Sequence, residues 1–391
     1  MHLIFYILSP FLTFLYSCAD LQKRSAQIVF VLFFGLFGYC HTFEDIRADS
    51  YRKYESFTNY TPESYEEIYN DFQNGTLKDI YEPILFRFLR HFTDNPHIMM
   101  MCVGLFGGFF YLLVVKRFLK DKRIGYTWPI AILLALLVIE SNIPLMGGIR
   151  NFSAFPLFMY ALIRLIIDNR KVWIIGIILT PLIHFGYIFA VVAALIAWLA
   201  KIPNTILHYA AIIVCVASIF LDTSSYAGVL DVAIGTIDND AIEDRMESYG
   251  EESTDEAFNK SLTTRLVRLN NQIGALFIIA LLIYIRRNRD TLLKTTYISR
   301  IYKLVLFFTL ISYAMISFSV VGQRYVYIAM VLLYFLLLNI YQDNPTSNIT
   351  KFIYSMPFVF CIHILWTLYN CYSNTGIEIY FLPLPVLIML Y

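Results

Sequence analysis

Residues 140–187 read ESNIPLMGGIRNFSAFPLFMYALIRLIIDNRKVWIIGIILTPLIHFGY and contain two apolar stretches around a short polar turn. Arg150 follows two glycines at the start of the first stretch, and Pro181, His184 and Gly186 interrupt the second. If the two stretches cross a membrane in opposite directions, Arg150 and His184 lie near the same membrane face. Arginine and histidine are costly at membrane depth, so this pair indicates a functional site.

The composition of the chain indicates a membrane protein. Of its 391 residues, 58% are hydrophobic and only 15% are charged, whereas an ordinary soluble domain is about 25% charged. Apolar runs recur along the whole sequence, which indicates several crossings rather than one anchor. The formal net charge of +1 offers no basic surface for a nucleic acid. The six cysteines contain no CxxC pair and are interpreted as packing residues.

The apolar runs predict an all-α, polytopic membrane fold with about thirteen transmembrane helices, in a range of roughly 11–14. Each run is close to the ~20 residues that a helix needs to cross ~30 Å of hydrocarbon. The run 172–200 is too long for one crossing and too short for two. Pro181 and Gly186 therefore predict a broken helix pair near 181–186 that meets at the outer face. The expected spans are 2–18, 26–41, 97–115, 124–140, 151–167, 172–185, 186–200, 204–221, 268–285, 301–319, 325–341, 352–370 and 376–391.

Basic residues in the short loops set the predicted orientation, because such residues gather on the inner side of a membrane. If Lys23 and Arg24 lie inside, the basic segments 116–123 and 286–303 fall inside as well. The alternation then puts the N-terminus outside and the C-terminus inside.

Two long polar segments are expected on the outer side of a single integral membrane domain, residues 1–391. The loop 42–96 contains two predicted amphipathic helices, one that starts near residue 61 and one that starts near residue 82. The loop 222–267 is acidic. It is interpreted as a solvated loop, with a mobile lid as the alternative.

Four polar features share the outer face in this orientation. Arg150 opens a helix after two glycines, and Arg324 lies at another outer helix end. Two arginines that converge with backbone donors suit an anion, a pyrophosphate above all. His184 is a candidate to bond that phosphate or to take a proton. Asp45 and Asp49 are candidates for a general base or for binding sugar hydroxyls.

Each of these residues also has an ordinary structural interpretation. An interfacial arginine often snorkels toward head groups, a buried histidine often bonds a neighbouring carbonyl, and loop acids often cap turns. No metal site and no cofactor are expected, because the sequence contains no GxSxG, HExxH, Walker A or Cys/His cluster motif. Weaker candidates for binding a sugar or a head group are Arg47, Tyr51, Arg52, Glu82, Arg87 and Tyr325.

Five motifs occur in order over about residues 20–340. They are DIRADSYRKY (45–54), YEPILFRFL (81–89), GGIRNFSAFPLFMYAL (147–162), PLIHFGYIFAVVA (181–193) and GQRYVYIA (322–329). Together they resemble the EpsG-like branch of the Wzy-type polysaccharide polymerases, bacterial membrane enzymes of exopolysaccharide, capsule and O-antigen synthesis. Two features depart from that family. Its glycine-x-aspartate-tyrosine segment is stretched at Asp49-Ser50-Tyr51, and Gly186 replaces a frequent serine.

The resemblance implies a glycosyl transfer that joins oligosaccharide repeat units carried on undecaprenyl pyrophosphate. The growing chain would pass from its lipid pyrophosphate to a new lipid-linked unit, at the outer face of the bacterial cytoplasmic membrane and without a nucleotide sugar. Arg150 and Arg324 would bind the pyrophosphate, and Asp45, Asp49 or His184 would serve as base. The expected partners are this lipid-linked oligosaccharide and membrane lipid, together with a flippase and a chain-length regulator.

Three other functions stay open on the sequence. A glycosyltransferase that adds one lipid-linked sugar would share the topology and the Asp45–Asp49 segment. A flippase or exporter of the same lipid would place charges through the middle of the membrane, whereas here they gather at one face. A membrane O-acyltransferase with His184 as base would take its acyl donor from inside, although His184 is assigned to the outer face.

Overall fold

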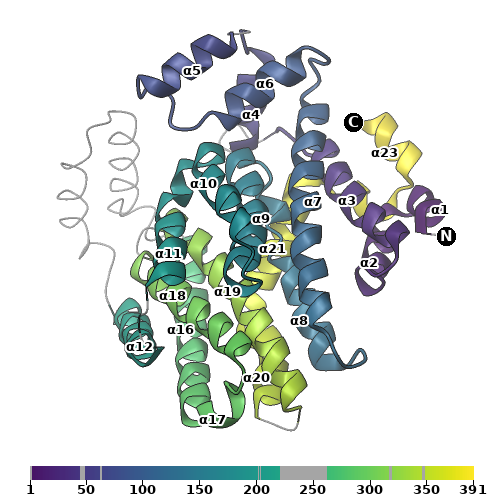
Figure 1. Ribbon diagram of the computed structural model, residues 1–391. Helices are drawn as coiled ribbons and strands as arrows, with labels where there is room; N and C mark the ends of the chain where they lie inside the picture. Colours follow the sequence, from purple (N-terminus) through teal and green to yellow (C-terminus); the bar gives the residue numbers. More distant parts are fainter. Residues whose placement is uncertain are drawn as a thin grey trace.

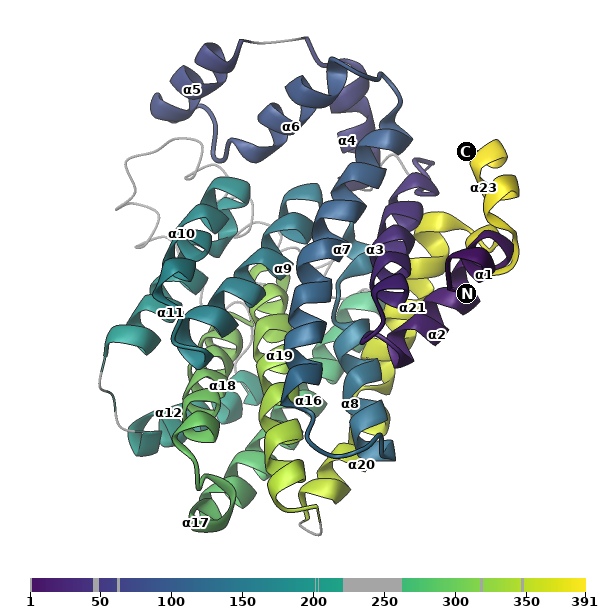
Figure 2. The same ribbon diagram turned by 45° about the vertical axis from the view of Figure 1, so that its right-hand side comes forward.

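The chain is all-helical in the computed structural model, which describes residues 2–44, 49–61, 64–200, 202, 204–220, 262–316, 319–345 and 348–391 (Figure 1). Within these ranges no strand is present, as the sequence predicts. Long helices run between the two ends of a bundle, and short helices cover one end (Figures 1 and 2). We call the end covered by α4, α5 and α6 the capped end, and the end that carries α17 the opposite end.

The first apolar stretch folds back on itself. α1 (His2–Leu8) and α2 (Pro10–Ala19) pack on each other and on α3 (Arg24–Tyr39). His2 Nδ1 lies 3.0 Å from Ser25 Oγ, and the His2 ring stacks on Tyr16. A single crossing over 2–18 would separate His2 from Ser25, so the predicted first span is wrong. His2 also lies beside the start of α3, whereas the predicted alternation puts it on the side opposite Lys23 and Arg24. The reason is Pro10, which ends one helix and begins the next.

Three short helices form a layer over the capped end: α4 (Asp49–Thr58), α5 (Tyr65–Gln73) and α6 (Tyr81–Arg90) (Figure 2). The two helices predicted in the loop 42–96 are therefore present, and α4 precedes them. α5 starts after Ser64 because of a capping box, in which Ser64 and Glu67 each accept a hydrogen bond from the other's backbone amide.

Glycines bring α3 and α7 (Pro96–Asp121) close together. A Cβ on Gly104 would overlap the backbone carbonyl of Phe34, and a Cβ on Gly38 would overlap that of Met100. Small residues of this kind let membrane helices approach backbone to backbone. α8 (Trp128–Ile139) then returns to the capped end through the turn η1 (Ile143–Leu145), and α9 (Ile149–Leu162) with η2 (Ile163–Ile167) packs against α7.

The run 172–200 is broken, as its proline and glycine predict. It forms η3 (Lys171–Trp173), α10 (Ile174–Ile183), η4 (Phe185–Tyr187) and α11 (Ile188–Leu199). His184 lies between α10 and η4 with extended backbone, φ −151°. The amide of Ile80, just before α6, donates to the carbonyl of Leu182 at 3.1 Å. The break therefore lies at the capped end.

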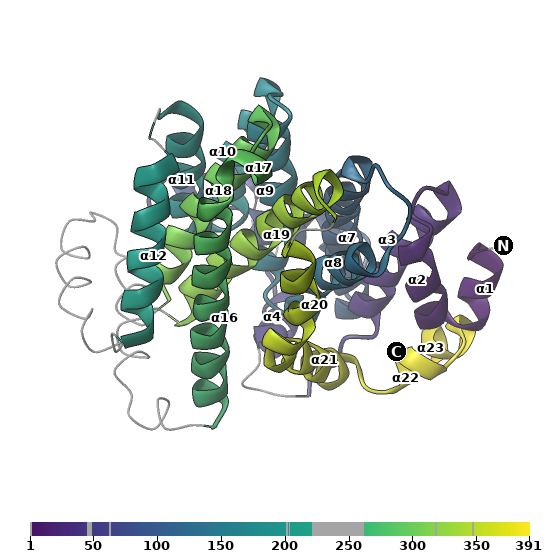
Figure 3. The same cartoon turned by 90° about the horizontal axis from the view of Figure 1, so that it is seen from below.

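α19 (Ser319–Asp343) is the central helix of the second half. All its residues from Ile328 to Tyr341 are buried, as expected for an apolar helix surrounded by others. α18 (Thr296–Ala314) packs along α19, and α12 (Asn204–Phe220) packs on α18 and α16 (Leu262–Arg287) (Figure 3). α17 (Arg289–Leu292) turns the chain at the opposite end. The predicted acidic loop 222–267 lies outside the described residues up to 261, and the chain is helical from Leu262 onward.

The last predicted span, residues 376–391, forms two short helices that do not cross the bundle. α20 (Ile349–Val359) and α21 (Cys361–Thr375) form a bent pair at 48°, and α22 (Glu378–Phe381) and α23 (Leu384–Leu390) follow. The Tyr391 ring lies 5.9 Å from that of His97, at the capped start of α7. The predicted alternation puts the C-terminus on the same side as the basic segment 116–123. The C-terminus lies instead at the capped end beside the start of α7, because α22 and α23 are too short to span and pack on α2 and α1.

The described helices identify a membrane protein with fewer spans than expected. Six are long and apolar enough to cross a membrane, or seven if the bent pair is one span. The predicted count of about thirteen is not confirmed, because several apolar stretches form helices of 7 to 17 residues. The six spans are Pro96–Asp121, Trp128–Leu145, Ile149–Ile167, Arg265–Arg287, Thr296–Ala314 and Gly322–Asp343.

A charged network joins three helices at the opposite end. Arg117 of α7 donates to Asp168 at 2.6 Å and to Asp121 at 2.5 Å. Arg164 donates to Asp168 at 2.6 Å, and the Tyr297 hydroxyl donates to Asp121 at 2.5 Å. Since every charge in this buried network has a partner, its desolvation cost is offset. The basic segments 116–123 and 286–303, which the sequence puts on one side of the membrane, thus lie together at this end.

Candidate active site at the capped end

Arg150 is the second residue of α9, which begins directly after Gly147 and Gly148. Its Nη1 lies 3.0 Å from Asp79 Oδ2, and its Nε lies 3.4 Å from Glu82 Oε2. The Arg150 side chain is nevertheless 33% exposed. Two carboxylates therefore orient the guanidinium while part of it stays accessible to a ligand.

Asp79 is nearly fully buried, and its neighbours hold it above the break between α10 and α11. The amide of Ile80 bonds the end of α10 at Leu182. The Tyr81 hydroxyl lies 2.8 Å from Ser153 Oγ on α9. The start of α6 is thus tied to α9 and α10 at once, which places the Asp79 carboxylate between those two helices.

His184 faces Asp79 from the break. Its Nδ1 lies 3.9 Å from Asp79 Oδ2, which is too long for a hydrogen bond. Both ring nitrogens are buried without a hydrogen-bond partner among the described residues. His184 lies outside the six candidate spans. Burial, together with the positive charges of Arg324 and Arg150, lowers the pKa of His184 to about 4, although Asp79 opposes the shift. The ring is therefore neutral at neutral pH and is able to accept a proton.

Arg324 approaches the same ring from α19. The Tyr325 hydroxyl donates to the Gly186 carbonyl at 2.7 Å, which attaches the turn after His184 to α19. A Cβ on Gly186 would lie 3.0 Å from Arg324 Nη1 and 3.2 Å from His184 Nε2. Glycine thus leaves the space in which the two side chains meet. Arg324 forms no ion pair or hydrogen bond with any residue that the structure describes.

Lys53 of α4 completes the cluster, since its Nζ lies 2.6 Å from Glu82 Oε1. Three cations therefore stand against two carboxylates, with the histidine neutral, and the net positive charge suits an anion. We call these six residues the charged corner: Lys53, Asp79, Glu82, Arg150, His184 and Arg324.

The acids and arginine predicted in the first outer loop are not part of this cluster. Asp45 and Arg47 lie outside the described residues. Asp49 and Arg52 form an ion pair with each other on an exposed face of α4. The structure therefore brings Arg150, His184, Arg324 and Glu82 together, but not Asp49 and Arg52.

Three further candidates have structural contacts. The Tyr51 ring lies 6.0 Å from the Tyr54 ring on α4. The Arg87 guanidinium lies 4.9 Å from the centre of the Tyr65 ring on α5. Tyr325 is buried and holds the turn at Gly186. Tyr325 therefore positions its neighbour Arg324 rather than facing a ligand itself.

Asp79 was missed from the sequence, although a signal existed. It lies three residues before Glu82, just ahead of the helix that begins at Tyr81, and both carboxylates contact Arg150. It also adjoins the YEPILFRFL motif. The sequence around Asp79 does not indicate its ion pair with Arg150, because the two residues are 71 positions apart in the chain.

The arrangement joins an anion site to a proton acceptor. The Arg150 and Arg324 guanidiniums flank a neutral imidazole, and Arg324 has no ion-pair partner among the described residues. A buried carboxylate, Asp79, faces the same imidazole. No group of three or more His, Cys, Asp or Glu is placed to hold a metal ion in the described part of the chain. Two arginines that meet beside a neutral imidazole are an arrangement able to stabilise negative charge.

Comparison with known proteins identifies the family. A family model described as the EpsG family matches residues 54–384, which include every residue of the charged corner except Lys53. The chain belongs to the EpsG family. The predicted resemblance of the chain to the EpsG family is thereby confirmed. Neither the curated proteins nor the solved structures contain a match to this EpsG-family chain.

Proposed function

We propose that this EpsG-family protein is a polysaccharide polymerase that joins oligosaccharide repeat units carried on undecaprenyl pyrophosphate. Family membership supports the enzyme class, and the charged corner supports a pyrophosphate leaving group. The basic segments 116–123 and 286–303 belong to the opposite end. By the positive-inside rule, the charged corner then faces the outer side of the bacterial cytoplasmic membrane.

The proposed reaction breaks one bond and forms one bond at the anomeric carbon of the first sugar of the growing chain. The bond to the pyrophosphate oxygen breaks, and its electrons leave with the lipid pyrophosphate. A bond to an acceptor hydroxyl oxygen forms, and the hydroxyl proton passes to a base. Negative charge grows on the departing phosphate in the transition state, so fixed cations beside that phosphate lower the barrier.

Arg150 and Arg324 are the proposed pyrophosphate ligands. Arg150 is oriented by Asp79 and Glu82 and stays partly accessible. Arg324 has no ion-pair partner among the described residues. The observation that carries the proposal is the meeting of Arg150, which Asp79 and Glu82 orient, with Arg324 at His184.

His184 is the proposed base. Its neutral ring is able to accept the hydroxyl proton, and the resulting imidazolium would face the carboxylate of Asp79, 3.9 Å away. A buried carboxylate beside a catalytic histidine stabilises the protonated ring in the same way in other enzymes. We prefer His184 to Asp49, because Asp49 is exposed and paired with Arg52.

Replacing the two arginines tests the proposal. In a strain that lacks the chain's own gene, the wild-type protein should restore a ladder of lipid-linked products. Arg150→Ala and Arg324→Ala should each lower the yield of polymer by about 10²-fold or more, since each removes a transition-state contact to developing charge. Single repeat units should then accumulate on the lipid. The ladder is read on a gel of extracted lipid-linked saccharides.

The matched control is Arg265→Ala, which removes an exposed arginine of α16 outside the charged corner. It should leave the ladder unchanged. Normal ladders in both corner variants would contradict the proposal. A wild-type product with one added sugar and no ladder would instead favour a glycosyltransferase that adds a single lipid-linked sugar.

A further inference from the structure

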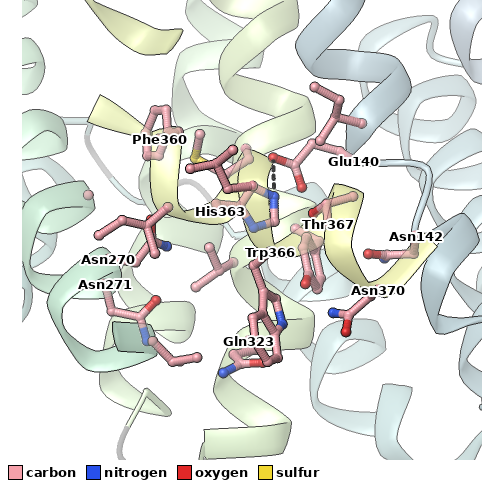
Figure 4. Close-up of a pocket in the computed structure, with 18 of the residues that line it drawn as sticks. Glu140, Asn142, Asn270, Asn271, Gln323, Phe360, His363, Trp366, Thr367 and Asn370 are labelled. Atoms are coloured by element: carbon pink, nitrogen blue, oxygen red, sulfur yellow. Dashed lines mark ion pairs between the residues drawn. The ribbon is translucent and has the colours of Figure 1, made fainter. Parts of the chain in front are cut away.

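A second site lies across α19 from the charged corner. A cavity of about 420 Å³ opens among α8, α16, α19 and α21 (Figure 4). The first turns of α19 separate the two sites, because Gln323 lines the cavity whereas Arg324 meets His184. The stretch from Asn142 to Arg150 also borders both sites. Asn142 lines the cavity, and Arg150, in the first turn of α9, belongs to the charged corner.

Carboxamides from several elements face this cavity (Figure 4). Each carboxamide offers both donors and an acceptor, which suits a ligand with many hydroxyl groups. Asn270 Oδ1 is buried without a hydrogen-bond partner among the described residues. The five amide side chains are Asn142, Asn270, Asn271, Gln323 and Asn370.

A buried carboxylate adds a second unused acceptor. Glu140 Oε1 accepts a hydrogen bond from the Tyr334 hydroxyl at 2.9 Å and lies 3.3 Å from His363 Nε2. Glu140 Oε2 is buried and has no hydrogen-bond partner in the described part of the chain. Buried acceptors are normally satisfied, so Glu140 Oε2 and Asn270 Oδ1 point to donors that a ligand supplies.

Aromatic side chains line the same cavity and its mouth. Tyr327 lies within, while Trp366 and Tyr369 of α21 are partly exposed beside the exposed Leu365. Flat aromatic faces pack against the C–H face of a sugar ring, and amides bond its hydroxyls. Exposed apolar side chains at the mouth are compatible with a ligand that arrives from lipid.

We propose that this cavity binds the saccharide of the lipid-linked repeat unit, while the charged corner binds its pyrophosphate. The inference rests on the proposed function, because it assigns the cavity to another part of the same substrate. A pyrophosphate is not expected in the cavity itself. There the amides are neutral, and the Glu140 carboxylate would repel an anion.

Binding to two lipids tests this assignment on the purified full-length protein. One probe is the lipid-linked repeat unit extracted from a strain that lacks the chain's gene, and the other is undecaprenyl pyrophosphate without sugar. Trp366→Ala and Asn271→Ala should each weaken binding of the sugar-bearing lipid at least about tenfold, and should change the affinity for the sugar-free lipid by less than about twofold. Tyr372→Ala, which removes another exposed aromatic of α21 that does not line the cavity, should change neither affinity.

Wild-type affinity of both cavity variants for the sugar-bearing lipid would overturn the saccharide site, and so would an equal loss for the two lipids. Arg324→Ala should weaken binding of both lipids, because both carry the pyrophosphate. If the two cavity variants show the selective loss but the wild-type protein makes no product ladder, the saccharide site stands and polymerisation is refuted. The two proposals can therefore fail separately.

Discussion

His184 enters any reaction as a neutral ring. Its burial and the two nearby arginines lower its pKa to about 4, well below the ordinary value of about 6.5. The positive charge for an anionic ligand therefore comes from Arg150 and Arg324, and His184 is left free to take a proton. In the proposed reaction, the arginines would then contact the leaving group and His184 would act as the base.

The pH dependence of polymerisation should report this low pKa. As pH falls, kcat/KM should stay constant from about pH 8 to about pH 5 and decline only toward pH 4, because a base is lost when it is protonated. The decline in kcat should occur at a higher pH, since bound pyrophosphate offsets the charges of Arg150 and Arg324. Initial rates of the purified protein at limiting and saturating lipid measure both profiles. An acidic decline of kcat/KM centred near pH 6.5 would contradict the role of His184.

The sequence predicts the polar residues of the charged corner that lie in apolar stretches, but it does not predict Asp79. Arg150, His184 and Arg324 stand out because polar side chains are rare in apolar stretches. Asp79 lies in a polar loop, where an acid carries no such signal. Its role follows only from the packing of α6 on α9 and α10. Asp49 carried a family signal, but its ion pair with Arg52 turns it toward the exposed face of α4.

Among the helices, the contact between α3 and α7 depends on glycine. Gly104→Ala should lower the thermal midpoint of the purified protein, because the added methyl group overlaps the Phe34 carbonyl and the backbones must separate. Overpacking of this kind costs about 1–3 kcal/mol. Thermal unfolding in one detergent, followed by intrinsic fluorescence, measures the shift.

Gly125→Ala is the control for this prediction. No atom lies within 4 Å of a Cβ built on Gly125, so this variant should keep the wild-type midpoint. Equal midpoints for Gly104→Ala and the wild type would show that α3 and α7 do not need their close approach.

Helix breaks are predictable from sequence where a proline or glycine lies in an apolar stretch. The number of membrane crossings is harder to predict. Pro181 and Gly186 predict the break at His184, which the structure confirms. Hydropathy alone counts every apolar stretch as a crossing. The stretches 2–18 and 376–391 instead fold into short helices that pack on each other beside the bundle, because their breaks leave no helix long enough to span.

The whole molecule keeps two parts of the proposed substrate apart. The charged corner and the amide-lined cavity lie on different sides of the central helix α19, and both adjoin the segment that leads into α9. The opposite end carries a network of paired charges around Arg117 and a polar cavity lined by His208, Arg286 and Arg289. The proposed binding and transfer use the capped half, where Arg150, Arg324 and His184 meet.

Reconstitution of the purified protein in liposomes with the lipid-linked repeat unit alone tests whether this chain is itself the polymerase. No nucleotide sugar and no other protein is added. The structure and the family predict products with two, three and more repeat units, together with an equivalent release of undecaprenyl pyrophosphate, and both should be lost in Arg324→Ala. Liposomes that contain well-folded wild-type protein yet yield neither product, or yield product only when a nucleotide sugar is added, would contradict the proposal.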